Sequence, residues 1–561
     1  MRRSLATILL TSALLFSFAS APTASRANVQ RKATRAAKAA PVSLASKRGA
    51  DTITAAQLKD YLSFIASDEM EGRDTPSRGL DTTAKFLAMN LARWGLKPGG
   101  DDGTYFQKIA LRKDGIDKEQ TIASLNNQPL TIGEDYIPVG RGGEASGPLV
   151  FAGNGWFFKA KNVDAYKDID ARGKIAVIFT PPDGLPRGFS PADLTGKRGE
   201  DWIDPGEYAR KQGVVGLIIV PGFQFIANWQ RNLNRITEGG ATSVEKFQAA
   251  APAALPTIIA SPRLANLLFQ SERQNATVLF ETTSGSTLPA AFELNPEKKI
   301  SMKLVAKHNQ LATQNVVAVF EGSDPILKEE YVAVGCHYDH VGIGTPVNGD
   351  AIYNGADDDG SGTTALLAMA EALAKAPVKP KRSILFVWHA GEEKGLWGSR
   401  YFVENPTVPI NKIVTQLNID MIGRSKKPGD TNPRNKELTG PDEIYVIGSK
   451  MMSTELGALS ESVNKGYLNL SFNYRYDDPN DPNRFFFRSD HFNYARKGIP
   501  IIFYFDGEHE DYHRPGDSAD KIDYEKMQKV TRTVYLMMWE LANRAARPAV
   551  DKQLPKELSG N

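Results

Sequence analysis

The feature that most constrains the fold is a set of four apolar stretches in the C-terminal half, each followed by acidic or histidine residues. They are Tyr331–Cys336 before His337, Ser383–His389 before Glu392 and Glu393, Val414–Ile419 before Asp420, and Ile499–Phe505 before Glu508, His509 and His513. Between residues 300 and 546 such strand-like stretches alternate with helical patterns, which predicts a doubly wound, mostly parallel α/β sheet flanked by helices. Because ligands bind beyond the carboxyl ends of strands in such sheets, these polar side chains are expected to share one crevice.

A fifth polar segment lies between the first two of these strands. Residues 354–362 read Asn-Gly-Ala-Asp-Asp-Asp-Gly-Ser-Gly and open an expected helix at Thr363–Ala376. Free N–H groups and the macrodipole at a helix N-terminus favour carboxylates there. Taken alone, the acidic triplet is also consistent with a solvated helix cap. The surrounding glycines indicate close backbone approach, which favours a role in a site.

The chemistry of these residues is imidazole plus carboxylate, with no cluster of thiolates. This set suits zinc in a catalytic site better than zinc in a structural one. Two metal ions need a bridging carboxylate, and a further carboxylate must stay off the metals to act as general base. The adjacent pair Glu392 and Glu393 fits this division, because neighbouring loop residues can point in different directions.

Six motifs occur along the C-terminal half in this order: His337–Asp339, Gly355–Gly362, Glu392–Gly395, Asn418–Gly423, Arg488–His491 and Tyr512–Pro515. Together they resemble a known family, the co-catalytic zinc aminopeptidases that share a fold with glutamate carboxypeptidase and the transferrin receptor. The N-terminal helices, with Glu71-Gly72-Arg73 and Gly79, match the family more loosely. The β-rich segment between them resembles a protease-associated domain, at Tyr166–Val177 and Ala209–Val220.

The resemblance implies two zinc ions per chain, bridged by Asp358. It assigns His337 and Asp420 to one ion, and Glu393 and His513 to the other. The implied activity is removal of N-terminal residues from peptides by a metal-activated water.

The same resemblance assigns four residues to catalysis. Glu392 would be the general base, and Asp339 would orient His337 and fix its tautomer. Tyr512 and Arg488 match positions that contact the substrate or the transition state in some relatives, with packing or a surface ion pair as the alternative.

Other conspicuous side chains are interpreted as structural. His340 is interpreted as loop structure, His389 as a core residue or the support of a ligand, and His491 as a cleft wall. His509 is a ligand candidate ranked behind His513, and Cys336 is interpreted as a small buried apolar residue. Residues Phe485–Phe487 would form either a substrate pocket or part of the core.

The N-terminus predicts export. Arg2 and Arg3 precede an uncharged apolar run, Leu5–Ala21, that is followed by small residues, as in a secretory signal peptide. The run is short for a membrane span, so no stable membrane anchor is expected, and the mature protein is predicted to be periplasmic or secreted. One cysteine in 561 residues excludes an intramolecular disulfide.

These patterns divide the chain into six parts: a signal peptide (1–27), a flexible leader (28–50), the N-terminal part of the peptidase domain (51–137), an inserted protease-associated domain (138–287), the catalytic zinc peptidase domain (288–546) and a C-terminal tail (547–561). With 68 basic and 65 acidic residues, the chain lacks the basic excess of nucleic-acid-binding proteins, and peptides are the expected substrates. The oligomeric state stays open, a dimer included.

Three alternatives to an aminopeptidase remain. The first is a carboxypeptidase or dipeptidase of the same fold. The second is a glutaminyl cyclase, which uses one zinc ion and lacks the full ligand set. The third is a receptor-like binding protein without metals. The complete set of ligands favours hydrolysis, because function follows from the site and not from the fold.

Overall fold

The computed structural model describes residues 42–140, 142–181, 184–186, 188–190, 193–248, 255–277 and 290–552. The predicted signal peptide and the predicted leader as far as residue 41 lie outside them. No helix within the described residues is long and apolar enough to cross a membrane.

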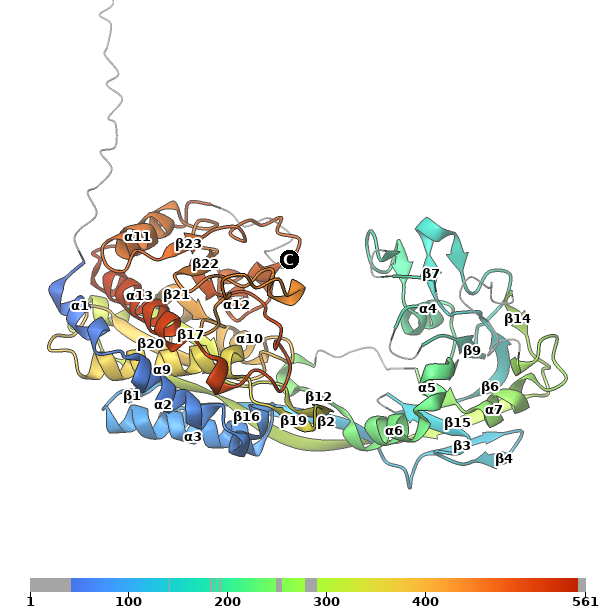
Figure 1. Ribbon diagram of the computed structural model, residues 1–561. Coiled ribbons are helices and arrows are strands. Elements are labelled where there is room, and N and C mark those ends of the chain that lie inside the picture. Colours follow the sequence, from blue (N-terminus) through green and yellow to red (C-terminus); the bar gives the residue numbers. More distant parts are fainter. Residues whose placement is uncertain are drawn as a thin grey trace, which may run out of the picture. The chain divides into compact units, whose positions relative to one another are not determined.

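The larger sheet has the strand order β12-β2-β16-β20-β17-β21-β24-β22-β23. Most of these strands are labelled in Figure 1. Its four central strands are parallel: β20 (Ser383–His389), β17 (Tyr331–His337), β21 (Ile413–Ile419) and β24 (Ile501–Phe505). The flanking strands are β1 (Lys97–Pro98), β2 (Phe106–Ile116), β12 (Ala241–Val244), β16 (Ala306–Phe320), β22 (Glu443–Ile447) and β23 (Ser471–Asn473). Strands β16 and β22 join the parallel strands in antiparallel fashion, so the predicted parallel arrangement is confirmed for the centre of the sheet.

Helices cover both faces of this sheet. Successive side chains of a strand point to opposite faces, so a buried apolar strand has side chains to pack on each face. Val332 and Val334 of β17 pack in one core, and Ala333 packs in the other. The first core includes residues of α1 (Leu44–Asp51), α2 (Ala55–Ile65), α3 (Arg78–Arg93), α9 (Gly362–Ala374), α11 (Thr454–Lys465) and α13 (Tyr524–Asn543). The second includes residues of α10 (Trp397–Glu404) and α12 (His491–Ala495). The predicted α/β class with flanking helices is thereby confirmed.

A second sheet has the order β4-β3-β15-β6-β9-β11-β13-β5, with β14 paired to β6. Its strands are β3 (Ile122–Leu125), β4 (Gln128–Leu130), β5 (Tyr136–Val139), β6 (Gly143–Phe151), β9 (Ile175–Phe179), β11 (Gly216–Val220), β13 (Thr257–Ala260), β14 (Phe292–Glu293) and β15 (Lys299–Leu304). The nearby helices are α4 (Pro205–Lys211), α5 (Phe223–Ala227), α6 (Trp229–Asn234) and α7 (Pro262–Phe269), and short strands are β7 (Phe157–Phe158), β8 (Val163–Asp164) and β10 (Trp202–Ile203).

This second sheet extends past the boundaries placed at residues 138 and 287. Strand β3 precedes the first boundary and β15 follows the second, yet the two pair with each other in antiparallel fashion. The boundaries were placed where the composition of the sequence changes. The pairing of β3 with β15 joins residues far apart in the chain, and no local sequence pattern indicates it.

The N-terminal helix α1 corrects one prediction, since residues up to 50 were expected to be a flexible leader. Ser43 caps α1 by accepting a hydrogen bond from the Ser46 amide. Ala50 is fully buried, and a Cβ on Gly49 would lie 2.3 Å from the Tyr535 hydroxyl of α13. Tertiary packing on α13 orders this segment, and its Lys- and Ser-rich composition does not show that.

Candidate metal centre

The predicted metal ligands converge at the carboxyl ends of the parallel strands. His337 is the last residue of β17, and Asp420 directly follows β21. Glu393 lies in the loop after β20, and His513 lies in the segment after β24. Asp358 comes from the turn that precedes α9. The crevice expected from the strand pattern is therefore present.

The first group of side chains consists of His337, Asp358 and Asp420. His337 Nε2 lies 3.3 Å from Asp358 Oδ1 and 3.5 Å from Asp420 Oδ1. The other ring nitrogen, Nδ1, lies 3.1 Å from the Asp339 carbonyl oxygen, so the backbone of Asp339 orients the ring. The Ser489 hydroxyl donates to Asp420 Oδ2 at 2.6 Å, which fixes that carboxylate.

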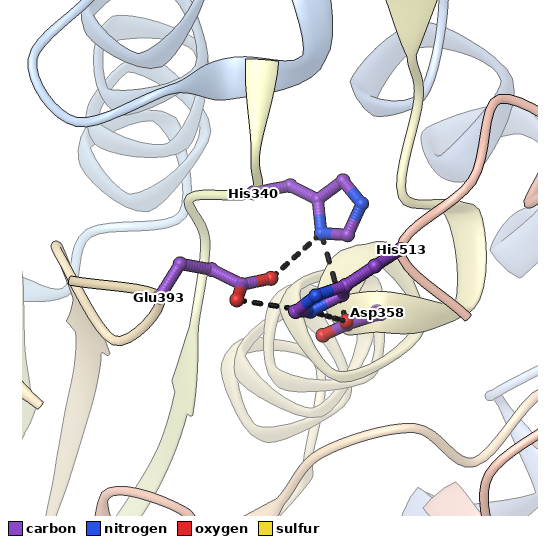
Figure 2. Close-up of side chains that lie close together, drawn as sticks. All are labelled: His340, Asp358, Glu393 and His513. Carbon is purple, nitrogen blue, oxygen red and sulfur yellow. Dashed lines mark ion pairs between the residues drawn. The ribbon is translucent and has the colours of Figure 1, made fainter. Parts of the chain in front are cut away.

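The second group consists of Asp358, Glu393, His513 and His340 (Figure 2). His513 Nε2 lies 3.2 Å from Asp358 Oδ2 and 3.0 Å from Glu393 Oε2. Asp358 thus presents one oxygen to each group, as a bridging carboxylate would. His513 has a φ of 52°, a backbone conformation that is uncommon outside glycine and that clusters at functional sites.

The unsatisfied atoms of the two groups fit a cation. Within the part of the chain that the structure describes, six buried atoms of these two groups lack a hydrogen-bond partner: His337 Nε2, His340 Nδ1 and Nε2, Asp358 Oδ2, Glu393 Oε1 and His513 Nε2. Buried polar atoms are normally paired, so a convergent set of this kind fits a bound cation. Imidazole and carboxylate donors together match zinc.

The acidic turn is buried, and this rules out the alternative of a solvated cap. Asp359 Oδ1 accepts hydrogen bonds from the amides of Gly362 and Met421. Asp357 Oδ1 accepts one from the amide of Gly423, at 2.6 Å. Backbone amides therefore hold the carboxylates of Asp357 and Asp359, whereas the carboxylate of Asp358, between them in the sequence, faces His337 and His513.

Asp339 was predicted to orient His337, and its carboxylate also accepts hydrogen bonds from two other residues. Oδ1 accepts from the Glu392 amide at 3.2 Å, and Oδ2 accepts from the Thr75 hydroxyl at 3.0 Å. The same hydroxyl accepts from the Gly391 amide. Sequence reasoning missed Thr75, and a lone threonine in the N-terminal part gives no signal that could have identified it.

Arg73 anchors the loop that carries Asp358 through hydrogen bonds to the residues that precede it. It is fully buried and donates to the carbonyl oxygens of Ile65, Tyr338, Asn354 and Gly355 at 2.7–3.0 Å. The Glu-Gly-Arg motif noted in the sequence is thus a structural anchor for the centre.

We expect Arg73→Ala to lower the free energy of unfolding by about 3–5 kcal/mol, because four buried carbonyls lose their donor and a buried charge is removed. Chemical denaturation of the metal-free protein measures this effect. Arg78→Ala is the matched control, since Arg78 is exposed and should change stability by less than about 0.5 kcal/mol. Equal stability of the two variants would contradict the anchoring role.

A cavity opens beside the first group. Its lining residues are His337, Asp358, Glu392, Asp420, Met421, Phe485, Arg488, Phe503, Phe505, Glu508 and Tyr512. Burial raises the pKa of Glu392 well above its ordinary value in the metal-free protein, and Glu393 and Asp420 add to the effect of burial. The predicted catalytic residues Glu392, Tyr512 and Arg488 therefore line the same space.

Tyr512 and Arg488 have defined neighbours in this cavity. The Tyr512 ring stacks on the His513 ring, with 4.0 Å between centroids. Burial and the charge of Asp358 raise the pKa of Tyr512 far above its usual value, so its hydroxyl keeps its proton. Arg488 pairs with Glu508 at 2.6 Å and lies over the Phe485 ring.

The remaining histidines and Cys336 have other partners. His389 lies between the Cys336 carbonyl and the Tyr494 hydroxyl, and His491 contacts the Phe486 carbonyl and stacks on Phe503. His509 Nε2 faces Asp357 Oδ2 at 3.3 Å and belongs to neither metal-ligand group. Cys336 is buried in the core, as predicted. Of the three phenylalanines Phe485–Phe487, Phe485 lines the cavity and Phe486 is buried.

The charge around His513 predicts how metal uptake depends on pH. Burial alone would lower the pKa of His513, but Asp358 and Glu393 outweigh it and raise the pKa to about 10. The imidazole is then protonated at neutral pH, and a metal must displace that proton. We expect zinc binding to release protons and to weaken steadily as pH falls below about 10. Calorimetric titration in buffers of different ionisation enthalpy measures the release, and a pH-independent affinity would contradict it.

Comparisons with known proteins bear on this centre. Residues 315–538 match the profile of peptidase family M28. This part of the chain belongs to peptidase family M28. The motif-based resemblance to a zinc peptidase family is thereby confirmed, and both candidate metal-ligand groups and the cavity lie inside the matched residues.

Relatives of the M28 peptidase domain include the aminopeptidase YwaD of Bacillus subtilis, 24% identical over 60% of this chain and 69% of that protein. Leucine aminopeptidase 2 of Arthroderma otae is 27% identical over 36% of this chain, which spans about a third (35%) of that relative. Among solved structures, the aminopeptidase from Aneurinibacillus sp. strain AM-1 matches 91% of this chain and 98% of its own, with 16% identity and a TM-score of 0.49.

Proposed function

We propose that the chain is an exported two-zinc aminopeptidase. The observation that carries this proposal is the convergence of five predicted ligands in two groups that share Asp358, beside a cavity that contains Glu392. His337, Asp358 and Asp420 would hold one ion, and Asp358, Glu393 and His513 the other. Zinc ions at such a site supply Lewis acidity, which polarises the scissile carbonyl and makes water more acidic.

The side chains around the ions have complementary roles in hydrolysis. Glu392 takes a proton from the attacking water and delivers it to the leaving amine, which is general acid–base catalysis. Its backbone is held by Asp339, so its carboxylate stays at the cavity wall. Tyr512 keeps its proton and can donate a hydrogen bond to the carbonyl oxygen as negative charge develops there.

The charge of the cavity wall favours an amino terminus over a carboxyl terminus as the recognised group. Apart from the proposed metal ligands, Glu392 and Glu508 contribute carboxylates to the lining, whereas its single guanidinium, Arg488, already pairs with Glu508. A free ammonium group finds acceptors here, while a C-terminal carboxylate has no unpaired basic partner in the lining. This supports an aminopeptidase over a carboxypeptidase.

Two further parts of the proposal rest on the sequence. The charged start and apolar run of residues 1–21 support export to the periplasm or the medium. The second sheet is interpreted as a protease-associated domain because of its motifs at Tyr166–Val177 and Ala209–Val220. Such a domain would restrict the access of long substrates.

The test is zinc analysis of the purified full-length mature protein together with peptidase assays. Free-amine and N-blocked aminoacyl substrates are compared, with and without a chelator. Two ions per chain and chelator-sensitive cleavage of the free-amine substrates alone would establish the proposal. Cleavage of blocked substrates alone would assign a carboxypeptidase, and ammonia release from an N-terminal glutamine would assign a cyclase. Absence of both zinc and cleavage would favour a binding protein.

A further inference from the structure

His340 is a histidine to which the motifs give no role, yet it lies within the second group. It comes three residues after His337 in the loop beyond β17, and its side chain is fully buried. Its Nδ1 atom lies 2.9 Å from Glu393 Oε1 and 3.7 Å from Asp358 Oδ2 (Figure 2). Zinc binds nitrogen and oxygen at about 2.0–2.1 Å, so two ligand atoms on one ion lie roughly 3–3.5 Å apart. The distance from His340 to Glu393 is close to that between two ligands of one ion, and the distance to Asp358 slightly exceeds it.

The contact with Glu393 is close but is not a hydrogen bond. Among the described residues, His340 Nδ1 and Glu393 Oε1 both lack a hydrogen-bond partner, although they are 2.9 Å apart. The ring therefore does not direct an N–H at that oxygen. Both atoms remain free to face a common third partner, which a cation between Glu393, Asp358 and His513 would supply.

The surroundings of the ring are built to hold it in this place. Gly355 has a φ of 56°, and a Cβ there would lie 2.5 Å from His340 Cγ, so a side chain at this position would collide with the imidazole. The His340 amide donates to the carbonyl oxygen of Arg73, which itself anchors the same turn. The hydrogen bond to Arg73 fixes the backbone of His340, and the close packing against Gly355 fixes its ring, so this side chain is not free to move as one in an exposed loop would be.

We propose that His340 is a fourth protein ligand of the ion held by Asp358, Glu393 and His513. The inference rests on the proposed two-zinc site and deepens it, because it makes the two ions unequal. One ion has four protein ligands, as structural zinc sites do, whereas the other has three and keeps an open position.

The cavity supports this division of labour between the ions. Its lining includes His337, Asp358 and Asp420 of the first group, but not His340, Glu393 or His513. The open coordination position therefore belongs to the ion beside Glu392, where substrate enters. The four-ligand ion is the one expected to bind more tightly and to remain when zinc is scarce.

The first experiment is zinc X-ray absorption on the unmodified, fully loaded protein, which counts imidazoles without any mutation. The proposal expects three imidazoles shared between two ions, from His337, His340 and His513. Two shared imidazoles would overturn it while leaving the two-zinc site intact. A protein that binds no zinc would overturn the proposed function as well, so the two failures are distinguishable.

The second experiment measures zinc affinity by competition with a chromophoric chelator. Loss of a residue that only supports a ligand typically costs 10–100-fold in metal affinity, so His340→Ala should weaken one of the two sites by more than about 100-fold. The matched control is His509→Ala, which removes a buried imidazole that faces Asp357 and neither group. Unchanged affinity at both sites in folded His340→Ala protein would contradict a ligand role.

Discussion

Replacing Glu392 with glutamine should lower kcat by about 10²–10⁴-fold, the range that general acid–base catalysis contributes, while both zinc ions stay bound. The change keeps the size of the side chain and removes only its ability to take a proton. Glu392 lies at the cavity wall and in neither metal-ligand group, so metal content should not change. Steady-state kinetics and zinc analysis on the same preparation measure both effects.

The neighbouring residue provides the matched control. Glu393→Gln has the same chemistry one position along the chain, but Glu393 Oε2 lies 3.0 Å from His513 Nε2 in the second group. It should lose zinc affinity as well as activity. If Glu392→Gln retained full turnover with two ions bound, Glu392 would not be the base.

Removing the shared carboxylate with Asp358→Ala should have the largest effect on metal content and on stability. Both groups contain Asp358, and each of its oxygens faces a different histidine. Metal that binds only the folded state contributes about 4 kcal/mol when free zinc is about 1,000 times Kd. The variant should lose that contribution and show little thermal shift on addition of zinc.

A chelator separates this effect from simple loss of packing. With zinc removed, the midpoints of thermal unfolding of the variant and of the original protein should converge. Asp420→Ala is the control, because Asp420 belongs to the first group alone and its loss should leave the second ion in place. Two ions per chain in Asp358→Ala would exclude the bridging role.

The strand pattern predicted where the centre lies, and the structure brings the five predicted ligands together. That success has a physical cause, since the ends of parallel strands meet at one edge whatever the loops do. His340 was interpreted as loop structure; it does lie in the loop beyond β17, but the sequence did not indicate that its ring is buried beside Glu393. The ring occupies space that a Cβ at Gly355 would block, at 2.5 Å from His340 Cγ, and this contact is a tertiary feature and not a local pattern.

Other differences have the same origin. Helix α1 is ordered by packing on Tyr535, and the second sheet joins strands from both sides of the predicted insertion. Thr75 acts through Asp339, and nothing near it in the sequence indicates that partner. Local chemistry is visible in a sequence, whereas long-range contacts that orient it are not.

The anchors of the centre have a consequence for how the chain reaches its native state. Arg73 and Thr75 contact residues 264 to 316 positions further along the chain, and His513 enters the centre later still. Closing such long loops slows folding, although its entropic cost grows only gradually with length. We therefore expect the centre to be completed late, after the sheet has formed, so that an exported chain would acquire its zinc only after translocation. Zinc would then select molecules that have already folded, and would not guide their early collapse.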